Sequence, residues 1–237
     1  MCTIALATRY LPGVPVAVGA NREERYDRPA LEPDYLEHDP LVYGPMDVSA
    51  GGTWIALNEN GLLVAITNRE SGPDGIRSRG WLVRDLVRLG DVDAAINETR
   101  SQVEMRTYSG FNLVVADRHA AAVMTWDGTF GVRSLQPGIH VIVNEGMNDE
   151  VGKSATVRSR LQAAELQTGD DWEHRCRRVL RDHGLGVCRH GRVGGTRSSS
   201  IICVSEMGAV RWLYADGSPC EWPYRPRLNG PVIGAST

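Results

Sequence analysis

Blocks of short apolar segments alternate with pairs of helical patterns along this chain, and that order limits the folds open to it. The predicted elements are, in order, strands within 4–67, two helices within 78–103, strands within 111–143, two helices within 155–183 and a hairpin over 200–214. Short strands with helices gathered in pairs favour antiparallel sheets covered by helices over a doubly wound parallel sheet. We therefore predict an α+β fold.

Two stretches lack a strong pattern. The polar, proline-containing stretch 22–49 is predicted to be an ordered surface loop, and the proline-rich tail from about 216 is predicted to be irregular. Because no shift in composition marks a linker, residues 1–237 are expected to form a single domain.

Charge and cysteine content narrow the class of protein. The 26 basic and 29 acidic residues give a net charge of −3, whereas proteins dedicated to nucleic acid are usually basic, so no nucleic-acid partner is expected. No apolar run reaches the roughly 18 residues of a membrane span. Five cysteines, an odd number, without a secretory leader argue against a disulfide framework. We expect a cytoplasmic protein with reduced thiols, and the sequence implies no particular oligomeric state.

Cys2 is the residue whose position most changes its chemistry. Dinucleotide, Walker, zinc-protease and serine-hydrolase motifs are all missing from the sequence. Aminopeptidases remove an initiator Met that precedes a small residue, which would expose a Cys2 α-amine with an unperturbed pKa of about 7.7–8.0. A thiol and an amine on one residue can act together as nucleophile and base. The alternative is that Cys2 is a small apolar residue opening a strand.

Polar side chains follow several of the predicted strands. Asn21, Arg22 and Glu23 follow the second strand, Asn68 follows the hairpin, and Asn144 follows the strand at 140–143. Strand ends are where a scaffold presents functional groups, and asparagine N–H groups are suitable donors to an oxyanion. The alternative for each asparagine is a role in a turn.

Short motifs recur in order over about residues 1–215. They are Met-Cys-Thr-Ile at 1–4, Asn-Arg-Glu-Glu at 21–24, Ala-Gly-Gly-Thr-Trp at 50–54, Thr-Asn-Arg at 67–69, Ser-Arg-Gly at 78–80, Gly-Phe-Asn-Leu at 110–113, Val-Asn at 143–144 and Thr-Arg-Ser-Ser at 196–199. This series resembles the NRDE proteins, the transport and Golgi organisation protein 2 family. The eponymous Asn-Arg-Asp-Glu reads Asn-Arg-Glu-Glu here, so the carboxylate at Glu23 sits on a side chain one methylene longer.

That family is similar in turn to the N-terminal-nucleophile amidohydrolases, the penicillin V acylase and bile salt hydrolase group. The resemblance implies a four-layer αββα sandwich of two antiparallel sheets flanked by helices. It also implies a hydrolase that cleaves a linear amide or thioester bond of a small acylated substrate. Those hydrolases carry an arginine three residues before the acidic residue, where this chain has Ala20, and Arg22 is the candidate to replace it.

The resemblance also implies roles for individual residues. Cys2 would be the nucleophile, Glu23 would orient or tune the α-amine, and Arg197 would be an electrostatic partner of the thiolate. Two asparagines, Asn68 and Asn144, would build the oxyanion hole. The candidate substrate-binding residues are Asn21, Arg22 and Trp54.

The sequence also bears on metals, anions and hydrophobic ligands as possible partners. No cofactor or metal is expected, because Cys176, His183, Cys188 and His190 lack the spacing of a zinc motif. Arg175, Arg178 and Arg181 lie on one helix face, which is either solvated or meets a phosphate or coenzyme A group. The main alternative to catalysis is a binding or trafficking protein for haem, lipid or acyl-coenzyme A, which the family resemblance also implies.

Overall fold

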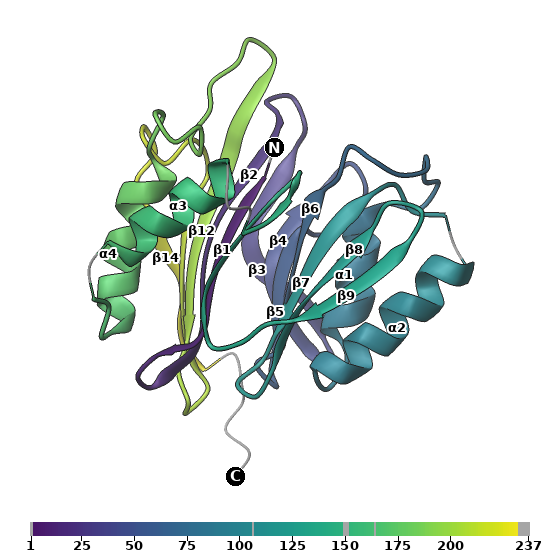
Figure 1. Cartoon of the computed structure of the whole chain (residues 1–237), viewed down its shortest axis with the longest axis horizontal. Helices are drawn as coiled ribbons and strands as arrows, with labels where there is room; N and C mark the ends of the chain where they lie inside the picture. The colour runs from purple at the N-terminus through teal and green to yellow at the C-terminus, as the bar shows by residue number, and fades with distance from the viewer. Residues whose placement is uncertain (1, 106, 149–151, 164, 232–237) are drawn as a thin grey trace.

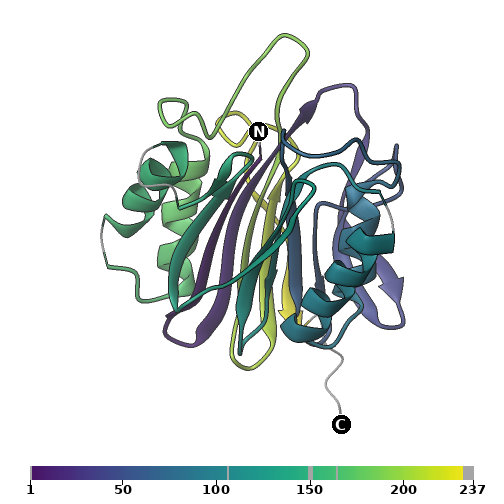
Figure 2. The same cartoon turned by 45° about the vertical axis from the view of Figure 1, so that its right-hand side comes forward.

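The computed structural model describes residues 2–105, 107–148, 152–163 and 165–231, and its two sheets pack face to face between two pairs of helices (Figures 1 and 2). Within the described residues the first sheet has seven antiparallel strands. Across the sheet they are β11 (Gly146–Met147), β10 (Gly138–Val143), β1 (Thr3–Leu11), β2 (Val14–Arg25), β12 (Gly194–Val204), β13 (Ala209–Ala215) and β14 (Arg225–Pro231).

The second sheet runs through the middle of the chain and is also antiparallel. Its described strands, in spatial order, are β3 (Ala30–His38), β4 (Leu41–Asp47), β5 (Ile55–Asn58), β6 (Leu63–Asn68), β7 (Phe111–Ala116), β8 (Ala121–Trp126) and β9 (Phe130–Ser134). Sequence order and spatial order coincide in this sheet, so each strand pairs with the one before it. Such a meander needs only short connections, apart from the helical excursion between β6 and β7.

Helices cover the outer face of each sheet (Figure 1). Helices α1 (Arg79–Val87) and α2 (Val92–Met105) pack on the second sheet, and α3 (Lys153–Gln162) and α4 (Gly169–Leu180) pack on the first. Three apolar layers result, one between the sheets and one under each helix pair. The α+β class and the four-layer sandwich that the family resemblance implied are therefore confirmed.

Helix α4 illustrates how the local sequence sets these layers. The Thr168 hydroxyl accepts from the Asp171 N–H while the Asp171 carboxylate accepts from the Thr168 N–H, a capping box that starts the helix. Trp172, Cys176 and Val179 then recur on one face and are buried against the first sheet. The helix face with Arg175 and Arg178 lies outward, as its spacing predicts.

Two predictions about irregular segments are wrong. Residues 22–49 are not a loop, because β2 continues to Arg25 and β3 and β4 form a hairpin. The sequence pattern did not reveal strand β3, because its charged and exposed residues replace the apolar alternation of a strand. Charged residues at a sheet edge prevent pairing with other chains. The tail from about 216 is irregular only in part, since 225–231 form edge strand β14, where prolines are tolerated. Residues 232–237 lie outside the described residues.

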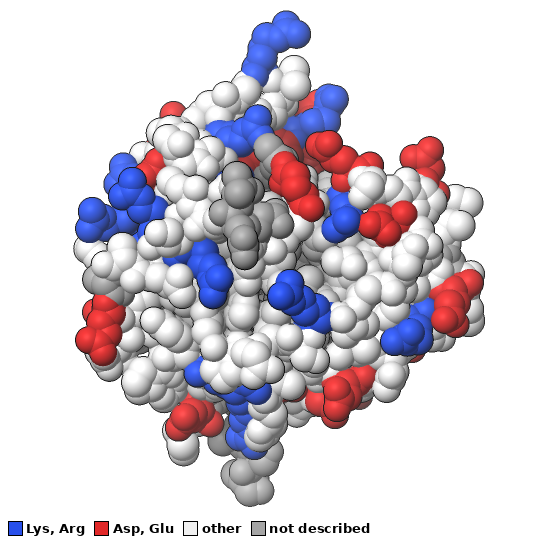
Figure 3. All heavy atoms as spheres, in the orientation of Figure 1, with Lys and Arg blue, Asp and Glu red and all other residues white. Residues whose placement is uncertain are grey.

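The surface and the helices bear on the expected partners. On the face that Figure 3 shows, Lys and Arg side chains are interspersed with Asp and Glu and form no single basic patch. In the part of the chain that the structure describes, no helix combines the length and hydrophobicity needed to cross a bilayer.

Tyr43 ties the two sheets together and yields a testable prediction. Its buried hydroxyl lies 2.9 Å from both the Pro33 and the Arg227 carbonyl oxygens, and the latter belongs to the opposite sheet. Tyr43→Phe should lower the free energy of unfolding by about 1 kcal/mol in urea titrations, because the two carbonyls lose the single O–H donor that they share. Tyr10→Phe, at an exposed site, is the matched control and should change little.

The same substitution should change alkaline stability. Burial raises the pKa of Tyr43 to about 12, whereas an unfolded tyrosine ionises near pH 10. Between these values the folded state holds more protons than the unfolded state, so stability falls as pH rises. Tyr43→Phe should make this fall shallower, and an unchanged slope of unfolding free energy against pH would contradict the assignment.

Candidate active site

A polar pocket of about 120 Å³ opens where the two sheets meet at the start of β1. Cys2 lies in this pocket, immediately before β1, together with Arg22 and Glu23 from the end of β2. Asn68 from the end of β6 and Trp54 from the segment before β5 complete the set of predicted residues that line it. Five of the eight residues singled out in the sequence therefore meet in one cavity, although they come from distant parts of the chain.

Cys2 is held by both its backbone and its side chain. Its N–H donates to Asn144 Oδ1 at 2.9 Å, and its Sγ lies 4.0 Å from the Glu23 carbonyl oxygen. Burial raises the pKa of the Cys2 thiol, while the Glu23 carbonyl contact and the charge of Arg22 act in the opposite direction. With Met1 attached, the thiol is therefore in its protonated form at neutral pH.

A pH dependence follows from that raised pKa. Because the thiolate is the nucleophile, alkylation of Cys2 by iodoacetamide in a chain that retains Met1 should accelerate with pH over a higher range than for an ordinary cysteine, whose pKa is about 8.5. Mass spectrometry of the Cys2 peptide across pH steps measures this rate, and a short unstructured cysteine peptide is the control. A Cys2 profile at or below that of the peptide would contradict the assignment.

Glu23 is a buried carboxylate beside the nucleophile. Its side chain is 5% exposed and lies between two cations, Lys153 Nζ and Arg189 Nη1, each 3.8 Å from a carboxylate oxygen. Burial lowers the pKa of Lys153, and Glu23 opposes that shift. The carboxylate thus lies between two cations and next to the first residues of β1, where a new α-amine would appear.

Arg22 forms a cationic wall of the pocket. Its guanidinium stacks 4.0 Å above the Trp54 ring, and its Nη2 lies 3.4 Å from Asp47 Oδ2. Arg28 Nε binds the same Asp47 oxygen at 2.8 Å. Asp47 and Arg28 were not predicted as site residues, although Arg28 follows closely on the Asn-Arg-Glu-Glu motif.

The two predicted oxyanion donors occupy different environments. The Asn68 side chain is exposed to the pocket and makes no hydrogen bond within the described residues, so its N–H groups are available. Asn144 is buried, and its Oδ1 accepts a hydrogen bond from the Cys2 N–H. Asn112 links these elements, because its Nδ2 lies within 3.1 Å of Thr67 Oγ1 and of the Val143 and Asn144 carbonyl oxygens. Asn112 was not predicted as a site residue, although it is the asparagine of the Gly-Phe-Asn-Leu motif.

Glycines bring two of the motifs into contact. A Cβ on Gly52 would lie 2.4 Å from the Gly80 carbonyl carbon, so only glycine permits this approach. The Thr53 N–H donates to the Gly80 carbonyl oxygen at 3.1 Å. This contact places Ser78 and Arg79, at the start of α1, along the pocket wall. It gives a physical reason for the Ala-Gly-Gly-Thr-Trp and Ser-Arg-Gly motifs.

Three predicted site residues do not line the pocket: Asn144, which contacts the Cys2 backbone, and Asn21 and Arg197, which lie elsewhere. Asn21 is 1% exposed, and its Nδ2 donates to the Leu180 and Val187 carbonyl oxygens on the α4 side of the sheet. Because side chains alternate along a strand, Arg22 faces the pocket and Asn21 faces away. Arg197 pairs with Asp216 at 2.9 Å and lines a separate hollow. Asn21 is therefore a structural residue, and Arg22 is the cation nearest in role to the one expected of Arg197.

The sequence is similar to one known protein family. The family model Transport and Golgi organisation 2 matches residues 1–185. The Transport and Golgi organization protein 2 homologs of Bos taurus and Homo sapiens are each 32% identical over 137 residues, covering 54% of this chain and 49% of theirs. The chain thus spans about half the length of the curated relatives it matches.

Solved structures share the fold. An N-acylethanolamine-hydrolyzing acid amidase ortholog of Caenorhabditis elegans matches with a TM-score of 0.57 and 16% identity, over 85% of this chain and 92% of that one. Penicillin V acylase from Agrobacterium tumefaciens matches with 0.61 and 12% identity, over 98% and 100%. A conjugated bile acid hydrolase variant from Clostridium perfringens matches with 0.53 and 13% identity over both whole chains. At such identities the likeness shows the N-terminal-nucleophile hydrolase fold alone.

Proposed function

Since this chain belongs to the Transport and Golgi organisation 2 family and folds like the N-terminal-nucleophile hydrolases, we propose that it is an N-terminal cysteine hydrolase. Its substrate would be a small acylated molecule with a linear amide or thioester bond. The observation that carries the proposal is the position of Cys2, whose thiol lies in a polar pocket next to a buried carboxylate.

The mechanism begins with the removal of Met1, which lies outside the described residues. The freed Cys2 amine takes the thiol proton, and Sγ forms a bond to the substrate carbonyl carbon. The proton then passes to the leaving amine or thiolate as its bond to the carbonyl carbon breaks. Water attacks the resulting thioester and releases the acid, which restores the thiol. Asn144 would hold the amine in place, and Asn68 would donate to the oxyanion.

The pocket lining favours a polar head group on the substrate. Arg79 donates to the Gly110 carbonyl oxygen at 2.7 Å and makes no ion pair within the described residues, whereas Arg22 and Arg28 share Asp47. The cationic charge at Arg79 is therefore the least neutralised in the pocket. A carboxylate next to the scissile amide, as in an N-acyl amino acid, would complement it.

Intact-protein mass spectrometry tests the proposal directly. The purified chain is incubated with a panel of N-acyl amino acids and acyl thioesters, and the reaction is quenched in acid. We expect a chain without Met1, an acyl adduct on Cys2 and released free acid. A chain that retains Met1, or that forms no adduct with any member of the panel, would refute the mechanism.

The alternative proposal is carriage of haem, lipid or acyl-coenzyme A, in the cytoplasm expected from the cysteine content. Haem titration separates the two. A Soret shift that a single His or Cys substitution abolishes, with no acyl adduct in the panel above, would favour carriage.

A further inference from the structure

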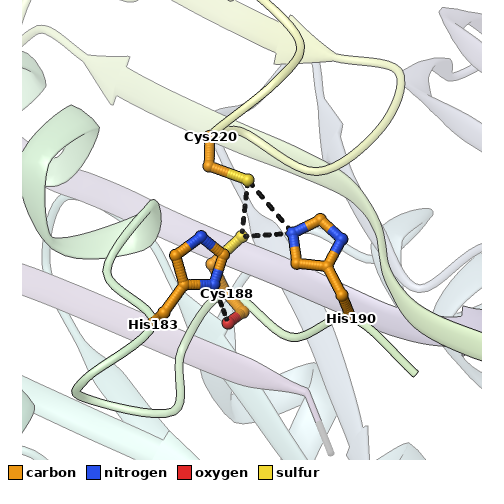
Figure 4. A group of neighbouring side chains, drawn as sticks. All are labelled: His183, Cys188, His190 and Cys220. Atoms are coloured by element: carbon orange, nitrogen blue, oxygen red, sulfur yellow. Dashed lines mark hydrogen bonds between the residues drawn. The ribbon is translucent and has the colours of Figure 1, made fainter.

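Four side chains from three separate segments converge beside the end of α4. They are His183 and Cys188 from the turn after α4, His190 from the loop before β12, and Cys220 from the loop after β13 (Figure 4). One ligand atom from each lies within 4.8 Å of all the others. Figure 4 shows the two sulfurs and the two imidazole rings facing a shared space. None of these residues takes part in the proposed hydrolysis.

The spacing of the ligand atoms matches a tetrahedral metal centre. Zinc bonds of about 2.3 Å to sulfur and 2.0–2.1 Å to nitrogen give tetrahedron edges of about 3.8 Å between sulfurs and about 3.6 Å between sulfur and nitrogen. Here Cys188 Sγ lies 3.5 Å from Cys220 Sγ, and His190 Nε2 lies 3.1 Å from Cys220 Sγ and 3.9 Å from Cys188 Sγ. All three distances lie within about 0.5 Å of a tetrahedral edge.

The orientation of His183 also fits metal binding. Its Nδ1 lies 3.1 Å from the Cys188 carbonyl oxygen, and only a protonated Nδ1 can donate there. That hydrogen bond leaves Nε2 as the unprotonated nitrogen. Ligating histidines commonly donate their other ring N–H to a backbone carbonyl in this way.

Backbone hydrogen bonds fix the segments that carry the ligands. The Cys188 N–H donates to the Asp182 carbonyl oxygen at 3.2 Å, which closes the turn after α4. Residues His190 and Gly195 form an isolated bridge across the next loop. Ser218 Oγ donates to the Thr196 carbonyl oxygen at 2.8 Å and so docks the loop with Cys220. The ligands are therefore positioned by the fold itself.

We propose that His183, Cys188, His190 and Cys220 bind one Zn²⁺ ion. Thiolates and imidazoles select zinc over magnesium or calcium, and two thiolates neutralise its charge. The sequence spacing argued against a metal because Cys220, 30 residues beyond His190, was not counted among the ligands. Since four protein ligands leave no open position, the ion would be structural.

A bound zinc ion would hold in place the loop with Cys188 and His190, which lies beside the candidate active-site pocket. Arg189 lies between ligands Cys188 and His190, and its Nη1 is 3.8 Å from the Glu23 carboxylate. Three of the four ligands lie beyond residues 1–185, which the family model matches. The zinc proposal therefore stands on its own geometry and does not depend on the proposed hydrolysis.

Elemental analysis of the purified chain tests the proposal. The chain is produced in zinc-supplemented medium, kept reduced, and dialysed against metal-free buffer. We expect one zinc per chain, which should be lost in Cys220→Ser and in His190→Ala. The matched controls are Cys203→Ala and His174→Ala, on β12 and on the exposed face of α4, and these should keep the metal. Zinc removal by a chelator should lower the Tm by roughly 5–10 °C.

Two further measurements use the unmodified chain, in case the variants fail to fold. Added Co²⁺ should give the visible absorption of tetrahedral thiolate coordination, and Zn²⁺ should protect Cys188 and Cys220, but not Cys203, from alkylation. The proposal is overturned by a zinc-free chain that also gives no cobalt absorption. Retention of zinc by both ligand variants, or a Cys188–Cys220 disulfide in the reduced preparation, would overturn it as well.

Discussion

Cys2→Ala should reduce turnover of an acylated substrate by a factor on the order of 10⁶ in kcat. The size follows from covalent catalysis, because without Sγ the carbonyl carbon has no nucleophile and the remaining groups only bind and polarise the substrate. Cys2 also sits at the point where Asn144 and Glu23 meet, so no other described thiol can replace it. The measurement is kcat/KM on whichever panel member the wild-type chain hydrolyses.

Two controls separate loss of the nucleophile from loss of the fold. Cys203→Ala removes a partly buried thiol elsewhere on the first sheet and should keep activity. A chain with an uncleavable extension before Met1 keeps the thiol but turns the α-amine into an amide, and it should be as inactive as Cys2→Ala. Activity in the extended chain would show that the amine is not the base. Activity within tenfold of wild type in Cys2→Ala would eliminate covalent catalysis by Cys2.

Local patterns in the sequence were sufficient to predict most of the helices and strands, whereas the four-layer sandwich was implied by the family resemblance. The stripe Trp172, Cys176 and Val179 predicted α4, and Ser78 predicted the start of α1, where its side chain accepts from the Gly80 N–H. Each of these signals acts within one or two turns of chain. Strands β3 and β14 were missed because they lie at sheet edges, where exposed and charged residues erase the apolar alternation.

The motifs in the sequence predicted which segments contribute to the site, but not which side chain of each motif faces the pocket. Arg22 and Asn21 are neighbours in the same motif, yet strand alternation sends one into the pocket and the other toward α4. The motif alone does not show which of the two faces inward. The pairing of Arg197 with Asp216 depends on how β12 meets the end of β13, which is a tertiary contact.

The proposed zinc ligands are a second case in which a contact between distant segments could not be predicted from the sequence. His183, Cys188 and His190 are close in sequence, but the fourth ligand, Cys220, reaches them only because β12 and β13 form a hairpin that returns the chain. The sequence predicts this hairpin, but it does not show that Cys220, in the loop beyond it, comes back to His183, Cys188 and His190. A metal site in which one ligand lies far from the others in the sequence can therefore be recognised only from the three-dimensional structure.

Asn68→Ala should lower kcat by about 10²–10³ while leaving KM and stability nearly unchanged. The Asn68 side chain is exposed in the pocket and makes no hydrogen bond within the described residues, so its removal costs the folded state little. Its N–H groups would act only when negative charge develops on the substrate oxygen, and an interaction made only in the transition state appears in kcat.

Asn68→Asp and Asn97→Ala make the test specific to hydrogen-bond donation. Asn68→Asp keeps the shape but replaces the donor by an acceptor that repels the oxyanion, so its kcat should fall at least as far as that of Asn68→Ala. Asn97→Ala removes an exposed asparagine on α2 and should leave kcat at the wild-type value. Should Asn68→Ala raise KM with kcat unchanged, Asn68 would bind the ground state, and the oxyanion donor would have to be sought among other pocket groups such as Arg79.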